Sequence, residues 1–253
     1  MSRVFKIAIA NQKGGEGKTT TAINLAFGLA YRNKRTLLLD LDPQANSTGI
    51  FIEPDLISIS AYDVFSGNAR MQDAVVATAV DNLSVVPSHI TLAEMETIGS
   101  NVDAPYLIRD ALQQIEKDFD YVVMDCPPSL SVFTINALVA ASHVIIPAQS
   151  EKFSIDGMKG LQNTINSVKR RINSNLEILG ALITQSKKHT VLHKTILPVL
   201  SEYFPVFEAA ICTGVAVGES HLSRQSIFDY APDSRQAQEY SNFIEEVIHE
   251  LEK

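Results

Sequence analysis

The chain has 253 residues, of which 45% are hydrophobic and 20% are charged, and its formal net charge is −8. These values are typical of a globular protein with a substantial core. The net charge excludes a polycation that binds nucleic acid over its whole surface, so such binding requires a local basic patch. Cys126 and Cys212 lie in apolar surroundings, which argues against a disulfide framework. Since no apolar run approaches the ~20 residues of a membrane span, we expect a cytoplasmic protein without membrane contact.

The most informative segment is residues 11–20 (NQKGGEGKTT), which follows an apolar run at residues 4–10 and precedes a helical pattern of apolar residues. A strand, a glycine loop and a helix in this order are typical of a loop that binds nucleotide phosphates. The glycines let several backbone N–H groups point at one anion, and the start of the helix adds its positive dipole end. A glycine-rich turn with two surface lysines is the alternative, but the flanking strand and helix favour a nucleotide site.

Individual side chains of this loop have distinct expected roles. Lys18 supplies a charge for the β- and γ-phosphates, and the Thr19 hydroxyl is placed to hold Mg²⁺. The common form of the motif has glycine where this chain has Gln12, and Lys13 is an additional lysine. Because one nucleotide site does not need that second lysine, it indicates a second role. Glu16 brings a carboxylate near the phosphates, where charge repulsion would weaken phosphate binding unless its side chain points away.

Two further predicted strands end in acidic residues. Residues 35–42 (RTLLLDLD) contain Asp40 and Asp42, and residues 121–125 (YVVMD) end in Asp125. Runs that are apolar on both faces are typical of a parallel sheet covered by helices on each side. Ligands bind at the carboxyl ends of such strands, so these acids are candidates for the nucleotide chemistry. The alternative for the first pair is that one acid caps a loop and the other is solvated.

The rest of the chain completes an α/β pattern. Further apolar runs predict strands at residues 83–87, 143–148, 178–184 and 206–211, and helical spacing predicts helices at residues 91–98, 106–119, 155–172 and 234–251. We expect a loop at residues 212–218. The predicted fold is therefore a mostly parallel twisted sheet flanked by helices on both faces, in a single domain over residues 1–253.

Three motifs, KGGEGKTT, DLDPQ and DCPPS, resemble those of the ParA/MinD class of deviant Walker A ATPases. The Asp-Pro-Gln sequence is similar to the ParA/Soj branch, the DNA partition ATPases, and is usually missing from MinD-like proteins. The resemblance covers essentially the whole chain and is closest to small ParA proteins without an N-terminal helix-turn-helix. It implies a P-loop NTPase fold and a weak, partner-stimulated ATPase with ATP and Mg²⁺ as cofactors.

The resemblance also implies roles for single residues. Lys13 reaches across an ATP-bound homodimer to the partner's nucleotide, and Asp42 orients the attacking water, so Lys13, Lys18 and Asp42 are the expected catalytic residues. Thr19, Asp40 and Asp125 hold the Mg²⁺. Nucleotide contacts are expected from the loop and from the later segment that touches the adenine in the family: Lys13, Gly14, Gly15, Glu16, Gly17, Lys18, Thr19, Thr20, Cys212 and Gly214.

Members of this family bind DNA without sequence preference through arginines that this chain lacks at the matching positions. Lys187, Lys188, Arg224 and Arg235 are the candidates to replace them, because a phosphate contact needs only positive charge. The alternative for the short basic run around Lys187 is a solvated loop.

The resulting hypothesis is an ATP-driven switch for chromosome or plasmid partition. In it, the ATP homodimer binds DNA nonspecifically, a ParB-like centromere-binding protein accelerates hydrolysis, and the protein associates with the nucleoid. The alternatives are a positioning ATPase for a protein cargo, a membrane-linked MinD-like regulator, and a small-molecule kinase or cluster-loading ATPase. The acidic end of the chain, EEVIHELEK, argues against a tail that docks on an anionic membrane.

Overall fold

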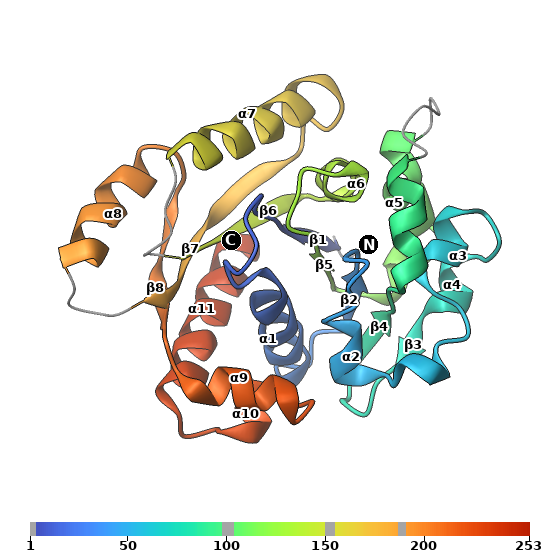
Figure 1. Ribbon diagram of the computed structural model, residues 1–253, viewed down its shortest axis with the longest axis horizontal. Helices are drawn as coiled ribbons and strands as arrows, with labels where there is room; N and C mark the ends of the chain where they lie inside the picture. The colour runs from blue at the N-terminus through green and yellow to red at the C-terminus, as the bar shows by residue number, and fades with distance from the viewer. Residues whose placement is uncertain (1–3, 98–103, 150–154, 187–190) are drawn as a thin grey trace.

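The computed structural model describes residues 4–97, 104–149, 155–186 and 191–253, and an eight-stranded sheet forms its centre (Figure 1). The strand order is β3-β4-β2-β5-β1-β6-β7-β8. The strands are β1 (Phe5–Ile9), β2 (Thr36–Asp40), β3 (Val76–Ala77), β4 (Leu83–Val86), β5 (Tyr121–Asp125), β6 (His143–Gln149), β7 (Glu177–Ser186) and β8 (Val206–Cys212). Only β3 pairs in the antiparallel sense among these described strands, which confirms the mostly parallel sheet.

Helices cover both faces of this sheet, as the sequence predicts. The α-helices are α1 (Lys18–Tyr31), α2 (Thr48–Phe51), α3 (Ala61–Phe65), α4 (Met71–Ala74), α5 (Leu107–Leu112), α6 (Val132–Ala140), α7 (Ile155–Arg171), α8 (Val191–Ser201), α9 (Val215–Leu222), α10 (Ile227–Tyr230) and α11 (Arg235–Leu251). Short 3₁₀ segments lie at Pro54–Leu56, Ile90–Thr97, Ala104–Tyr106 and Glu116–Asp118.

Side chains that alternate along the strands divide the core into two layers. Ile7 and Ile9 of β1 pack into a layer with α1, α10 and α11, whereas Ala8 and Ala10 pack into a layer with α3, α5, α6 and α7. The same alternation runs through β5. Because both faces are covered, the central strands are apolar at nearly every position, which explains the continuous apolar runs of the sequence.

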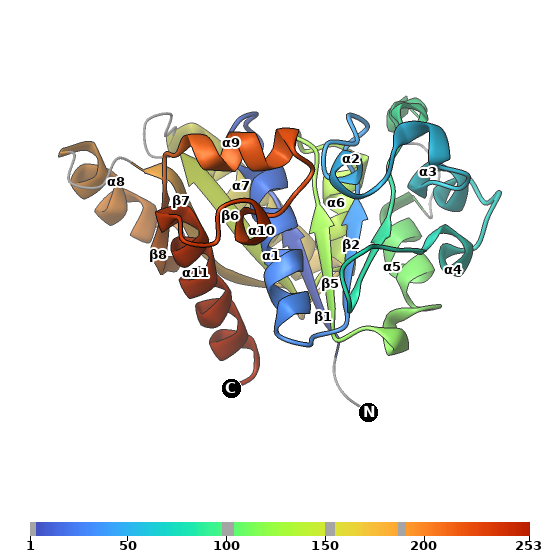
Figure 2. The same cartoon turned by 90° about the horizontal axis from the view of Figure 1, so that it is seen from below.

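The sheet brings the three sequence motifs together at one edge. In the strand order, β5 lies between β2 and β1, and the parallel register places Asp125 opposite both Ile9 and Asp40. The segments that follow these three strands therefore meet at the carboxyl edge of the sheet, where ligands of α/β proteins bind. Seen from below, the C-terminal end of α11 lies at the opposite end of the molecule from α9 (Figure 2).

Some predicted elements differ from the structure. The helix predicted at residues 106–119 ends at Leu112, because the Ile115 N–H bonds to the Leu112 carbonyl and the tighter turn brings the Ile115 side chain into the core. The predicted helix at residues 91–98 is a 3₁₀ segment. The predicted loop at residues 212–218 is short, because α9 begins at Val215 with Gly214 as its N-cap.

The buried face of α11 offers a test of the packing. Phe243 has 0% exposure and meets Phe207 edge-on with ring centroids 5.0 Å apart. We expect Phe243→Ala to lower the free energy of unfolding by about 3–5 kcal/mol, since it removes a large buried side chain and leaves a cavity. Leu222→Ala is the control, because Leu222 is 87% exposed and its removal should change stability by no more than about 0.5 kcal/mol. Urea denaturation of both variants measures this, and equal losses of stability would contradict the assignment.

Candidate functional site

The glycine loop has the backbone that the sequence predicts for a phosphate cradle. Gly15 and Gly17 adopt positive φ angles of 78° and 86°, a conformation that side-chain-bearing residues rarely reach. Gly17 is the N-cap of α1, so the first N–H groups of that helix face the loop. A Cβ on Gly14 would lie 4.0 Å from Pro128 Cβ. The loop therefore runs beside the proline turn that follows β5.

Side chains of β7 and the end of β1 hold this loop in place. Asn11 donates from Nδ2 to the Pro147 carbonyl at 2.7 Å and accepts at Oδ1 from the Lys13 N–H at 3.2 Å. The Thr184 hydroxyl donates to the Glu16 carbonyl at 2.8 Å. Gln185 Nε2 donates to the Gly15 carbonyl at 2.9 Å. These bonds tie Asn11, Gly15 and Glu16 to β6 and β7 and so hold the loop in one conformation.

Glu16 does not stand at the mouth of the loop. Its side chain is buried, and its carboxylate accepts the backbone N–H of Gln149 at the end of β6. Gly14 and Gly15, by contrast, are exposed. The carboxylate therefore points into the protein and has a structural partner. The sequence left open whether Glu16 would repel phosphates, and this geometry indicates an anchor for the loop.

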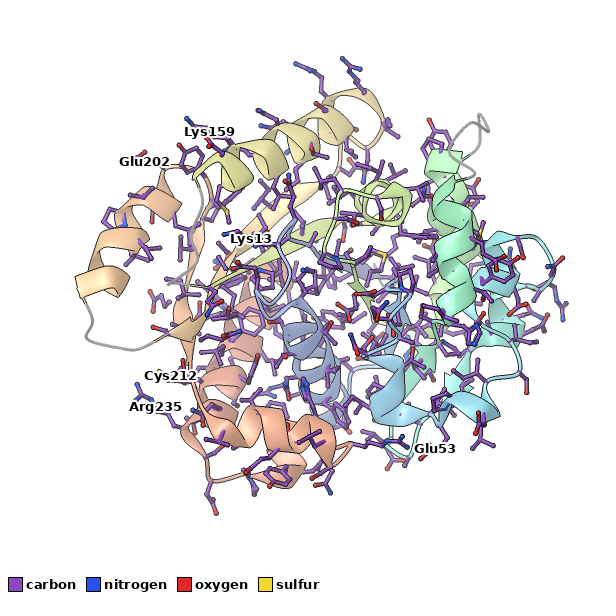
Figure 3. The ribbon with its side chains drawn as sticks, in the orientation of Figure 1. Lys13, Glu53, Lys159, Glu202, Cys212 and Arg235 are labelled. Carbon is purple, nitrogen blue, oxygen red and sulfur yellow. The ribbon has the colours of Figure 1, made fainter. Side chains whose placement is uncertain are left out.

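Lys18 is a buried cation among acids. Its side chain is 6% exposed, and Nζ donates to the Lys13 carbonyl at 2.6 Å. Burial lowers the pKa of Lys18, and the charges of Asp125 and Asp42 oppose that shift. The Lys13 side chain belongs to the same loop and lies on the side of it that faces α7 in the view of Figure 3.

Asp40 and Asp125 lie opposite each other at the ends of β2 and β5, and both are completely buried. Asp40 is an acceptor for three groups: its Oδ2 takes the Thr48 N–H at 2.9 Å and the Thr48 hydroxyl at 2.6 Å, and its Oδ1 takes the Asp42 N–H at 3.1 Å. The Thr48 hydroxyl also accepts the Ser88 N–H at 2.9 Å. Asp40 thus ties residues 41–48 to the ends of β2 and β4.

Asp125 has a different environment. Neither of its carboxylate oxygens has a hydrogen-bond partner among the described residues. Burial, followed by the charge of Asp40, raises the pKa of Asp125 well above its ordinary value, whereas the nearby hydroxyls of Thr19 and Ser47 favour the charged form. An uncompensated buried carboxylate is costly. Its oxygens are therefore available to a cation.

The residues present fit Mg²⁺ bound together with phosphates. Mg²⁺ typically takes one or two protein carboxylates, and water and phosphate oxygens complete its shell. Asp125 supplies the available carboxylate, and the Thr19 and Ser47 hydroxyls lie beside it. Within the described part of the chain, no group of three or more His, Cys, Asp or Glu side chains could hold a metal ion by itself.

The turn that contains Pro43 sets the direction of the Asp42 side chain. Its Oδ1 accepts the Gln44 N–H at 2.9 Å, its carbonyl accepts the Ala45 N–H at 2.9 Å, and Ala45 has a positive φ of 52°. The side chain is 8% exposed and close enough to Lys18 for its charge to act on the pKa of that lysine. The turn therefore holds the Asp42 carboxylate toward the loop.

A cavity of about 230 Å³ adjoins the loop on its other side. It is lined by Gly17 and Thr20 and by residues of the segment after β8, among them Cys212 and Gly214. The structure thus brings the two sequence-distant halves of the predicted nucleotide site together. A Cβ on Gly214 would lie 2.2 Å from Gln236 Nε2, so a larger residue would displace the Gln236 amide, which donates to the Thr213 carbonyl at 3.3 Å.

Of the predicted DNA contacts, the two that the structure describes, Arg224 and Arg235, pair with different acids. Arg235 bonds to Glu239 at 2.9 Å, and Glu239 accepts the Cys212 N–H at 2.7 Å, so this arginine supports the cavity wall (Figure 3). Arg224 pairs with Glu53. Lys187 and Lys188 lie outside the described residues.

Sequence analysis missed several residues that build the site. Asn11, Thr48 and Glu239 act through side-chain hydrogen bonds to distant backbone groups, and the Gln149 N–H is the distant partner of the Glu16 carboxylate. A linear pattern does not reveal such partners. Of these residues, Asn11 is the one that lies inside a recognised segment, residues 11–20.

Comparisons with known proteins agree with this geometry. A family model described as an AAA domain matches residues 4–178. The chain is 39% identical over 246 residues to the sporulation initiation inhibitor protein Soj of Bacillus subtilis, a match that covers 95% of this chain and 97% of that protein. It is also 39% identical over 248 residues to the chromosome partitioning protein ParA of Caulobacter vibrioides, covering 96% of this chain and 93% of that protein.

A similar solved structure contains the expected ligands. It is the cobyrinic acid a,c-diamide synthase of Mycobacterium smegmatis with a bound ATP analogue and magnesium. The two chains are 31% identical, the match covers 99% of this chain and 96% of that one, and the TM-score is 0.89. Among the described residues of the present chain, none of the helices has the length and apolar character that crossing a membrane requires.

The Glu16 anchor predicts an effect opposite to simple charge repulsion. Glu16→Ala leaves the buried Gln149 N–H without its acceptor, at a cost of about 1–3 kcal/mol, so we expect it to loosen the loop and weaken binding of a fluorescent ATP analogue. Glu16→Gln keeps an acceptor oxygen and should bind the analogue nearly as the unmodified chain does. Tighter binding by the alanine variant in a fluorescence titration would show that repulsion dominates.

The cost of burying Asp125 can be measured by thermal unfolding without magnesium. Since its pKa is raised in the folded state, the folded chain binds the proton more tightly than the unfolded chain, and stability falls as the pH rises through the raised pKa. We expect Asp125→Asn to raise the melting temperature at neutral pH by about 2–4 °C, the shift that about 1 kcal/mol gives in a chain of this size.

Magnesium with nucleotide should stabilise the unmodified chain and have a smaller effect on this variant. If Asp125→Asn melted below the unmodified chain at neutral pH without magnesium, the carboxylate would already be compensated and the cation site would be misplaced.

Proposed function

The chain belongs to the Soj/ParA family of chromosome-partitioning ATPases, and on that basis we propose that it is an ATP-driven switch in chromosome or plasmid partition. The observation that carries the proposal is the glycine loop, with its two lysines, set beside Asp125, whose carboxylate oxygens accept no hydrogen bond among the described residues. We further propose that residues 1–253 act as one domain and work in the cytoplasm.

ATP and Mg²⁺ are the proposed ligands, as in the solved M. smegmatis structure. The loop N–H groups and Lys18 would bind the phosphates, and Thr19 and Asp125 would hold the cation. Mg²⁺, when bound, neutralises charge on the phosphates. Asp40 would act on the cation through the backbone that it positions, because its oxygens already accept hydrogen bonds from Thr48 and Asp42.

In hydrolysis, the role that this geometry supports for Asp42 is to orient water. Gln44 fixes one of its oxygens, which sets the direction of the carboxylate. Lys18 must leave the Lys13 carbonyl to reach a phosphate. The Pro127–Pro128 turn beside Gly14 is placed to respond to the terminal phosphate, since a stiff turn transmits a small displacement.

The second lysine supports a dimer. Lys18 alone serves the phosphates of its own loop, and Lys13 contributes to that loop through its carbonyl, which accepts a hydrogen bond from Lys18. Gly14 and Gly15 are exposed at the loop mouth, so a second copy can approach it closely. We propose that Lys13 reaches the nucleotide of that second copy. The closed dimer would bind DNA nonspecifically, associate with the nucleoid, and be reset by a ParB-like partner.

One observation favours a second candidate, a positioning ATPase for a protein cargo. Arg224 and Arg235 are ion-paired with Glu53 and Glu239, so they are not free for DNA phosphates. A DNA-independent switch would use the same nucleotide site and a different output surface.

DNA binding by Asp42→Ala decides between these candidates. We expect this variant to hold ATP unhydrolysed, to form a dimer in light scattering, and to bind nonspecific duplex DNA with ATP but not with ADP. Binding should weaken steeply with salt, because phosphate contacts release counterions. A dimer that binds no DNA with either nucleotide would favour the protein-cargo adaptor.

Lys13→Ala is the control for this experiment. It should still bind ATP, because Lys18 remains, but it should neither dimerise nor bind DNA. An ATP-dependent dimer of Lys13→Ala would remove Lys13 from its proposed role across the interface.

A further inference from the structure

The outer face of α7 carries only hydrogen-bond donors and cations along its length after the first turn. Its inner positions, Met158, Leu161, Ile165 and Val168, are buried. Its exposed positions include Lys159, Asn163, Asn166 and Arg170. The spacing of four, three and four residues places these four side chains on one stripe of the helix.

The cations of α7 differ from most other exposed cations of the described chain, although the exposed Lys117 is likewise without an ion pair among the described residues. Lys159, Lys169, Arg170 and Arg171 form no ion pair among the described residues, whereas Arg32, Lys34, Arg35, Arg70, Arg109, Arg224, Arg235 and Lys253 each have an acidic partner. Lys169, Arg170 and Arg171 lie in the last turn, where cations interact favourably with the negative end of the helix dipole. Lys159 lies far from that turn, so the dipole does not account for it. The acidic residue of α7 itself, Asp156, lies in the first turn, at the other end of the helix from its three final cations. Lys159 lies toward the end of the molecule that carries Glu202 (Figure 3).

A shallow groove lies beside the stripe. Its volume is about 350 Å³, and its polar lining consists of Asn163, Thr164, Ser167 and Arg171, with no acid. An amide, two hydroxyls and a guanidinium are the groups with which proteins bind phosphate oxygens. The cavity at β8 and α11, by contrast, is lined by four glutamates. Among these surfaces, the α7 groove is the one suited to an anion.

The dimensions fit a nucleic-acid backbone. From Lys159 to Arg170 the helix rises about 17 Å at 1.5 Å per residue, which equals about five base pairs of duplex. No exposed aromatic residue lies on the described part of α7, and aromatic anchors are typical of protein interfaces. The groove wall also contains Ile135, Val168 and Ile172. The exposed row itself carries donors and no aromatic anchor, which favours phosphates over an acidic protein.

This face is also connected to the nucleotide loop. A Cβ on Gly160 would lie 3.0 Å from Gln12 Nε2, so α7 touches the loop one residue after Lys159. The Gln149 N–H that Glu16 accepts lies in the strand that leads into α7. Movement of the loop on binding phosphates would therefore be transmitted to the helix that carries the donors.

We propose that the outer face of α7, including the groove of Asn163, Ser167 and Arg171, binds the phosphate backbone of duplex DNA in the ATP state. This inference rests on the proposed function, and it places the DNA surface away from Arg224 and Arg235. It requires no sequence preference, since phosphate contacts carry none.

The test compares two triple variants in the Asp42→Ala background. One is Lys169→Gln, Arg170→Gln, Arg171→Gln, and the matched control, Arg70→Gln, Arg109→Gln, Lys253→Gln, removes the same charge from ion-paired surface sites. Binding of a nonspecific duplex is measured with ATP over a salt series. We expect the affinity of the first variant to fall at least tenfold and its salt slope to fall by about 0.9 for each phosphate that is no longer neutralised, and the control to change little.

A second variant tests the groove without changing the cations that interact with the C-terminal end of the α7 dipole. Asn163→Asp adds an acid to the groove without touching the last turn, and it should also weaken DNA binding while ATP-dependent dimerisation persists. Thermal unfolding of each variant checks that α7 remains folded.

The outcomes separate this inference from the proposed function. If the Asp42→Ala parent binds no DNA, the proposed DNA switch fails and the inference fails with it. If the parent binds DNA and the folded α7 variants keep its affinity and salt slope, only the α7 surface is overturned. Binding of poly-glutamate but not of DNA, abolished in the α7 variants, would assign the surface to an acidic protein and would also overturn the inference.

Discussion

The arrangement of the site depends on two carboxylates buried side by side at the ends of adjacent parallel strands. The register of β2 and β5 places Asp40 opposite Asp125, and neither is exposed to water. Two like charges in such a place are unfavourable unless other groups compensate them. The chain compensates them unequally. Asp40 receives three hydrogen bonds from its own segment, whereas Asp125 receives none among the described residues and depends on Lys18, on nearby hydroxyls and on a cation.

This asymmetry refines what the sequence pattern suggests. The resemblance assigns both acids to the Mg²⁺ shell, but hydrogen bonding separates a positioning acid from an available one. Asp40 organises the turn that carries Asp42 and links it through Thr48 to β4. A substitution at Asp40 would therefore disturb the direction of Asp42 even if the cation still bound to Asp125. Stability of the loop and chemistry of the site are coupled through the same carboxylate.

The sequence predicts the fold better than it predicts the site, and the reason is physical. Apolar runs such as residues 121–125 identify buried parallel strands, because both of their faces are covered. The glycine loop is recognisable because a positive φ requires glycine at Gly15 and Gly17. The anchor of Glu16 is not recognisable, since its partner Gln149 is 133 residues away. The loop predicted at residues 212–218 is shorter in the structure, because α9 begins at Val215 with Gly214 as its N-cap.

The same anchors explain how a local binding event can reach a distant surface. The loop is bonded to β6 and β7 through its carbonyls and through Glu16, so its N–H face is free to respond to phosphates while its other face is attached to the sheet. The Gln12 side chain lies so close to Gly160 that a shift of the loop toward α7 would have to displace either this side chain or the helix. A helix that is packed on one side and exposed on the other converts such a displacement into a change of its surface. The nucleotide loop and the donor-lined face of α7 are therefore parts of one mechanical unit, although they carry different chemistry.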